Sequence, residues 1–177
     1  MASKTILILA GRRIDRVNAD KARFPLSNIH LVKQALEKFF RDHQIGELVS
    51  SGACGADLLA QQVASDCKVR RTIILPFDRE TFRQTSVADR PGDWGELYDS
   101  LLENCSLQIL DYKKDDRQAY SKVTDAIVSS GIHTEKKLAL CLWDSVKKNH
   151  DDASAEFKTK AASAGYEVFE INTLAGA

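Results

Sequence analysis

The chain has 177 residues, with 25 Lys and Arg against 25 Asp and Glu, so its formal net charge at pH 7 is zero. Hydrophobic residues make up 44% of the sequence and charged residues 28%, which excludes a disordered or fibrous protein. Neutrality argues against a dedicated nucleic-acid-binding protein, because such proteins carry a basic excess. The length fits a single globular domain over residues 1–177.

No apolar stretch approaches the roughly 18 residues that a membrane helix needs, and the first apolar run is too short for a signal peptide. We therefore expect a cytoplasmic protein without a membrane partner. The cysteines are widely spaced, with no Cys-x-x-Cys pair, so neither a metal site nor a disulfide framework is expected, and no cofactor is predicted. These cysteines are Cys54, Cys67, Cys105 and Cys141.

Short apolar runs alternate with longer amphipathic stretches along the chain. Residues 6–10 are apolar throughout, as in a strand buried on both faces, and residues 29–43 show the apolar spacing of a helix. Further strands are predicted at 48–50, 72–76, 107–110, 138–143 and 166–171. Further helices are predicted at 57–67, 94–104, 117–129 and 151–164, and an irregular segment at 77–93. The alternation predicts one doubly wound α/β domain, with a mainly parallel sheet and helices on both faces.

Ligands of such folds bind beyond the C-terminal ends of the strands, where the strand order reverses. The loop after the first strand begins with Gly11 and continues through Arg12, Arg13 and Asp15. The two arginines would neutralise a phosphate, and the carboxylate would accept a hydrogen bond from a ribose hydroxyl. The alternative interpretation is a solvated basic loop.

The segment 50–57 lies between a predicted strand and a predicted helix and is rich in glycine and small residues. Such a loop lets a phosphate approach backbone N–H groups at a helix N-terminus. The predicted ligand contacts here are Ser51, Gly52, Gly55, Ala56 and Asp57. The segment is neither a Walker A loop nor a Gly-x-Gly-x-x-Gly loop. A plain tight turn with Asp57 as the helix N-cap remains the alternative.

Other candidate side chains follow the later strands. Phe77 or Phe82 would stack on a base, although aromatic residues beside a strand end also serve in the core. Asp144 ends the fifth predicted strand and would point at the same crevice. Glu156 lies in the first turn of the next predicted helix, where it would face the ligand or complement the helix dipole.

Together these loops resemble the SLOG superfamily, which is similar to the LOG-type phosphoribohydrolases and to the Rossmann-like domain of DNA-processing protein A. Many members of that superfamily belong to bacterial conflict and signalling systems, including antiviral defence. The resemblance implies a Rossmann-like domain that binds a nucleotide or a nucleotide-derived ligand, such as a cyclic or ADP-ribose-type molecule. It is carried by the segments Ala10–Asp15, Arg23–Pro25, Ser51–Asp57, Leu75–Phe77, Thr85–Val87, Asp93–Trp94 and Leu142–Asp144.

The family pattern is matched unevenly. Gly52, Gly55 and Asp57 fit its phosphate loop, and the resemblance adds Ser86 to the ligand contacts. Where relatives often carry Gly-Gly-Thr-Ala-Glu, this chain has Asp-Ala-Ser-Ala-Glu at 152–156, which keeps the Ser154 hydroxyl and a carboxylate but loses both glycines. The Pro-Gly-Gly-x-Gly-Thr-x-x-Glu motif of the hydrolases is absent.

Two functions follow as hypotheses. The preferred one is a sensor or sequestering module that captures a nucleotide-derived ligand without turnover. The alternative is an N-glycosidase or phosphoribohydrolase acting on a nucleoside monophosphate, in which Glu156 or Asp144 stabilises an oxocarbenium-like state. Binding of single-stranded DNA is disfavoured by the absence of a basic excess. Relatives of this kind often pair through helices, which makes a homodimer the oligomeric state to test.

Overall fold

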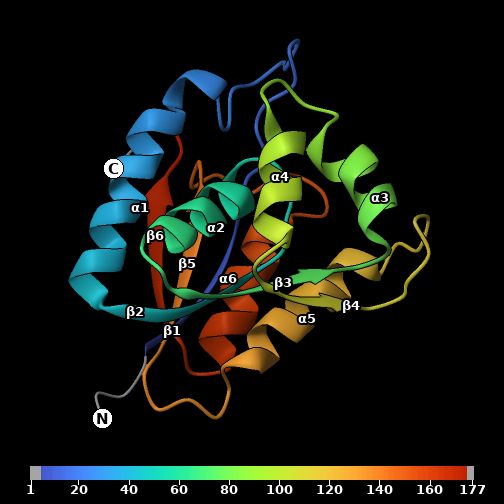
Figure 1. The fold of residues 1–177 in the computed structure, drawn as a ribbon. Helices are drawn as coiled ribbons and strands as arrows, with labels where there is room; N and C mark the ends of the chain where they lie inside the picture. The colour runs from blue at the N-terminus through green and yellow to red at the C-terminus, as the bar shows by residue number, and fades with distance from the viewer. Residues whose placement is uncertain (1–4, 175–177) are drawn as a thin grey trace.

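Six parallel strands form one sheet in the order β4-β3-β2-β1-β5-β6 (Figure 1). The computed structural model describes residues 5–174. The strands are β1 (Thr5–Gly11), β2 (Ile45–Ser50), β3 (Arg70–Leu75), β4 (Ser106–Ile109), β5 (Lys137–Trp143) and β6 (Glu167–Asn172). Every neighbouring pair runs parallel, so the doubly wound α/β fold expected from the sequence is confirmed.

Helices cover both faces of the sheet (Figure 1). One face packs against α1 (Ile29–His43), α2 (Ala56–Asp66) and α4 (Trp94–Leu102), and the other against α5 (Ala119–Ser130) and α6 (Ala153–Ser163). Strand β1 contributes to the hydrophobic core on each face of the sheet: Leu7 and Leu9 face the first group of helices, and Ile6 and Ile8 face the second. This is why residues 6–10 are apolar at every position. Among residues 5–174, no helix is both long and apolar enough to cross a membrane.

The segment after β3 is more regular than the sequence predicts. It forms a short helix, α3 (Arg79–Phe82), which runs directly into a π-helical turn, η2 (Arg83–Val87). A short 3-10 turn, η1 (Leu26–Asn28), likewise precedes α1. The Asp78 carboxylate caps α3 by accepting a hydrogen bond from the Thr81 N–H at 2.9 Å. Phe82 and Val87 are fully buried, so two apolar anchors hold a largely polar segment in place.

The loop before α2 presses against the loop after β1. Gly55 has a φ of +101°, which L side chains rarely adopt, and the Ala56 N–H donates to the Arg12 carbonyl at 3.0 Å. A Cβ at Gly55 would lie 2.7 Å from the Arg12 carbonyl oxygen and 2.7 Å from the Ile14 nitrogen. Only glycine therefore allows the two loops to meet in this arrangement.

We expect Gly55→Ala to lower the free energy of unfolding by roughly 2–4 kcal/mol, because it combines backbone overlap with an unfavourable φ. Urea denaturation measures this loss. Gly52→Ala is the matched control in the same loop, since a Cβ there would meet only side chains, at 3.3 Å or more. Equal losses in the two variants would contradict the close approach described here.

Candidate ligand-binding site

A cavity of about 340 Å³ opens beyond the C-terminal ends of β1 and β2. It is closed by the start of α2, by η2, by α5 and by the first residues of α6. Most of its wall is apolar, and a few polar side chains converge on it. The predicted ligand-binding residues that line it are Gly11, Arg13, Ser51, Asp57, Phe82, Ser86 and Ser154.

Helix α5 supplies much of the wall, and the sequence reasoning did not assign these residues to the site. Tyr120, Val123, Thr124 and Ile127 recur with helical spacing and all line the cavity. The spacing itself was visible in the sequence, but it indicates a buried helix face and does not distinguish a core contact from a ligand contact. The Tyr120 hydroxyl lies 3.0 Å from the Ser86 Oγ, which links α5 to η2.

Several backbone N–H groups of the glycine-rich loop already donate hydrogen bonds to acceptors within the protein. The Ala53 N–H donates to the Asp57 carboxylate at 3.2 Å, and the Cys54 N–H donates to the Ser86 carbonyl at 3.1 Å. The Ala56 N–H donates to the Arg12 backbone carbonyl. The helix N-cap is Gly55, and Asp57 lies in the first turn. Gly52, Gly55 and Ala56 do not line the cavity.

Asp57 is the buried carboxyl group of the cavity wall. Burial raises its pKa to about 7, against the opposing effects of the Ala53 N–H and the charge of Arg13. Near neutral pH the group therefore exists in both protonation states, and it can donate or accept a hydrogen bond. This gives the cavity a proton-sensitive polar group next to a helix N-terminus.

Arg12 and Arg13, predicted to act together on a phosphate, point in different directions. Arg13 lines the cavity, whereas the Arg12 guanidinium is buried between Asp144, at 2.9 Å, and Asp152, at 2.7 Å. Arg23 adds a second cation, 2.7 Å from the other oxygen of Asp144. Burial by itself would raise the pKa of Asp152, but the hydrogen bonds from Arg12 and from backbone N–H groups outweigh it and lower that pKa. Asp144 and Arg12 lie outside the cavity lining.

Three further predicted residues also lie outside the lining. Asp15 accepts hydrogen bonds from the backbone N–H groups of Arg23 and Phe24, and so shapes the loop after β1. Phe77 is buried in the core, with its ring centroid 5.9 Å from that of Phe82. Glu156 accepts from Ser121 Oγ at 2.5 Å, which ties α6 to α5, and pairs within α6 with Lys160 at 2.6 Å.

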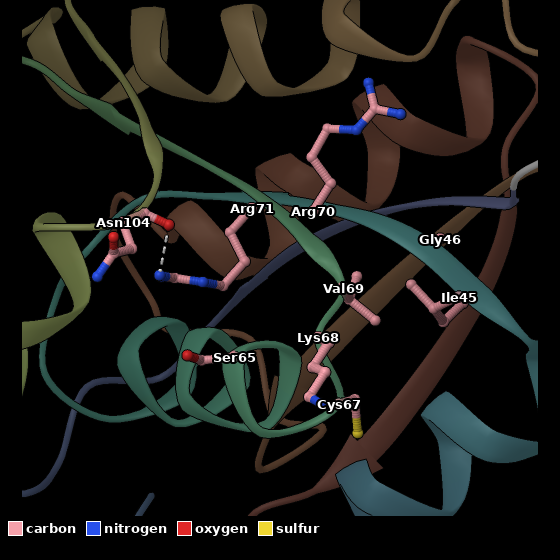
Figure 2. Close-up of a pocket in the computed structure, with 9 residues that line it drawn as sticks. All are labelled: Ile45, Gly46, Ser65, Cys67, Lys68, Val69, Arg70, Arg71 and Asn104. Atoms are coloured by element: carbon pink, nitrogen blue, oxygen red, sulfur yellow. Dashed lines mark hydrogen bonds between the residues drawn. The ribbon is translucent and has the colours of Figure 1, made fainter.

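A larger groove of about 570 Å³ lies at the opposite edge, along the N-terminal ends of β2 and β3. Its basic side chains do not converge: in Figure 2 Arg71 turns toward Asn104, while Arg70 extends away from it. The Arg71 guanidinium donates to the carbonyls of Leu101, at 3.0 Å, and Asn104, at 2.9 Å, at the end of α4. We attribute a structural role to this groove. Within residues 5–174 no cluster of His, Cys, Asp and Glu is suited to hold a metal ion.

No protein-family model and no curated protein matches the sequence. Among solved structures, the chain resembles DNA processing protein A (DprA) from Streptococcus pneumoniae, with a TM-score of 0.62 and 13% identity. The match covers 95% of this chain and 50% of that chain, so this chain spans half the length of DprA. At this identity the likeness shows the Rossmann-like fold.

Two weaker likenesses are to proteins that bind or carry a molybdenum cofactor. The Moco carrier protein from Chlamydomonas reinhardtii matches with a TM-score of 0.40 and 17% identity, over 98% of this chain and 92% of that chain. The molybdenum cofactor binding protein from Rippkaea orientalis matches with a TM-score of 0.37 and 12% identity, over 99% and 94%.

We expect Arg12→Met to destabilise the fold by about 3–5 kcal/mol at pH 7, because two fully buried carboxylates would lose their common partner. Urea denaturation gives the change in free energy. Arg23→Met is the matched control, since its side chain is 22% exposed and it contacts only one of the two carboxylates. A loss from Arg12→Met no larger than that from Arg23→Met would contradict the central role of Arg12.

We expect Asp57→Asn to be more stable than the wild type at pH 8, with its advantage growing by about 2–3 kcal/mol between pH 5 and pH 8. The native pKa is raised to about 7, well above the unfolded value. The contribution of protonated Asp57 to the free energy of unfolding is therefore complete below the unfolded pKa and is lost as the pH rises through 7. Thermal unfolding across this range tests it, with exposed Asp20→Asn as the control for losing one charge. A constant difference across the range would refute the raised pKa.

Proposed function

We propose that this chain binds a nucleotide-derived small molecule in the cavity beyond β1 and β2, as a sensor or sequestering module. The observation that carries this proposal is the cavity itself, which combines apolar walls with a cation, a buried carboxyl group and several hydroxyl groups. Its volume of about 340 Å³ falls within the range of about 300–1,000 Å³ that is usual for small-molecule sites.

The lining suggests how such a ligand is held. Tyr120 offers exposed aromatic surface for a base, with the buried Phe82 also in the wall, and Arg13 offers positive charge for a phosphate. The hydroxyl groups of Ser51 and Thr124 would bond polar edges of the base or sugar. Placement beyond the C-terminal strand ends supports the assignment, because doubly wound folds bind their ligands there.

Binding without turnover is favoured over glycoside hydrolysis by the state of the carboxylates. Asp144 is held by Arg12 and Arg23, and Glu156 is held by Ser121 and Lys160. Burial alone would raise the pKa of Glu156, but the bonds from Lys160 and Ser121 lower it, so the carboxylate is occupied by its ion pair. Neither Asp144 nor Glu156 lines the cavity, so neither is placed to act on a glycosidic bond there. We also propose that the chain is a member of the SLOG superfamily and acts in a bacterial signalling or conflict system.

We expect a thermal-shift screen of mononucleotides, cyclic nucleotides and ADP-ribose to give at least one stabilising ligand. A ligand at 100 times its Kd stabilises by about 2.7 kcal/mol. Calorimetry should then show that Tyr120→Ala weakens binding of that ligand by about five- to a hundredfold, through lost stacking. Tyr120→Phe should bind more tightly than Tyr120→Ala, and Tyr112→Ala, outside the lining, should match the wild type.

Chromatography of each stabilising ligand after incubation separates the two functions. An intact ligand supports the binding module. Release of free base, abolished by Glu156→Gln, would replace it with the glycosidase. Absence of any stabilising ligand across the screen would refute the proposed function.

A further inference from the structure

A second arginine, Arg90, lies beside Arg13, just outside the residues that line the cavity. Arg13 donates to the Cys54 Sγ at 3.4 Å and forms an ion pair with Asp89. Arg90 donates from Nη1 to the Ile14 carbonyl at 2.7 Å, and its Nε lies 3.6 Å from the second oxygen of Asp89. Two guanidinium groups thus share one carboxylate.

The charge of this pair is only partly neutralised. Burial, followed by the charge of Arg13, lowers the pKa of Arg90, while Asp89 opposes both. Cys54 adds no negative charge at neutral pH, because burial raises the pKa of its thiol. On the cavity side, Asp57 also faces Arg13, and its pKa of about 7 leaves it partly protonated. The cluster therefore retains positive charge beside the cavity.

Both guanidinium groups also carry an unused donor. The Nε atoms of Arg13 and Arg90 are buried and make no hydrogen bond within the described chain, although the Arg90 Nε is ion-paired with Asp89 at 3.6 Å. Buried polar groups in native proteins are almost always paired, so these donors on neighbouring side chains are available to an acceptor that a ligand would bring. Guanidinium donors are suited to phosphate oxygens, which they bind through charge-assisted hydrogen bonds.

The glycine-rich loop is the competing position for an anion, and its geometry is less favourable. The N–H groups of Ala53, Cys54 and Ala56 already have acceptors. An anion there would also lie close to Asp57, whose ionised form repels it. The arginine pair offers unpaired donors and positive charge, whereas the loop offers engaged donors and an acidic side chain.

We propose that Arg13 and Arg90 hold the phosphate group of the ligand on the Arg13 side of the cavity, with Asp89 as their counter-ion. This inference rests on the proposed function and specifies it: the ligand is a nucleoside phosphate whose phosphate is recognised by guanidinium groups. Arg90 then determines specificity for the phosphorylated ligand over its nucleoside.

The test compares a nucleoside monophosphate with the matching nucleoside by calorimetry, for each of the four common bases. For the base that binds, the wild type should prefer the monophosphate at least tenfold. Arg90→Gln should remove most of this preference and leave nucleoside affinity within about twofold. Arg79→Gln, an exposed arginine of α3 outside the lining, is the control for losing one positive charge and should keep the preference.

Asp89→Asn separates ligand recognition from a merely structural role. Removing the counter-ion should tighten monophosphate binding, in the direction opposite to Arg90→Gln. Equal weakening of both ligands in both variants would overturn the subsite, as would a wild type that binds nucleoside and monophosphate equally, although the latter leaves the proposed function standing. If neither ligand binds, titration with inorganic phosphate decides the subsite alone: phosphate that stabilises the wild type but not Arg90→Gln supports it, and any other result overturns it. The proposed function is then decided separately, by the wider screen that includes cyclic nucleotides and ADP-ribose.

Discussion

One buried guanidinium, that of Arg12, joins the two halves of the sheet at their carboxyl edge. It follows β1 directly and contacts the carboxylate that follows β5 and the carboxylate that caps α6. Asp152 accepts at the same time from Arg12 and from the N–H groups of Ser154 and Ala155. The start of α6, which forms part of the cavity wall, is therefore positioned by an ion pair that no ligand needs to contact. Such a buried pair is costly to form and more costly to break, which makes it a strong constraint on geometry.

The neighbouring arginine is directed to the opposite side of the backbone and has a different task. At the end of an extended strand, successive side chains alternate in direction, so Arg12 enters the ion cluster while Arg13 reaches the cavity. One residue fixes the scaffold and the next remains available for a ligand. The double-arginine motif thus combines two roles that neither residue type nor spacing distinguishes in the sequence.

The apolar pattern predicted most of the fold because it reports burial directly: β1 is apolar at each position from 6 to 10, as a central strand with two covered faces requires. The prediction that residues 77–93 are irregular was wrong for the part that forms α3 and η2, because Phe82 and Val87 anchor it in the core, which a local pattern does not reveal. In the candidate site, Asp57 was predicted from the loop after a strand and Ser86 from the family resemblance, and both line the cavity. A local motif does not reveal that the Cys54 N–H donates to the Ser86 carbonyl or that Arg12 donates to Asp144, because these partners are distant in the sequence.

The position of β1 in the sheet also bears on how the chain folds. Strands β1 to β4 are adjacent in both sequence and sheet, whereas β5 must return to pair with β1, bringing Lys137 to Ile6. Closing that long loop is entropically slow, so we expect the first four strands to assemble before β5 docks. Until it does, Arg12 has none of its carboxylate partners. The ion cluster therefore forms only once this slow closure is complete, and contacts formed after the rate-limiting step act mainly on the rate of unfolding, which governs the lifetime of the native state.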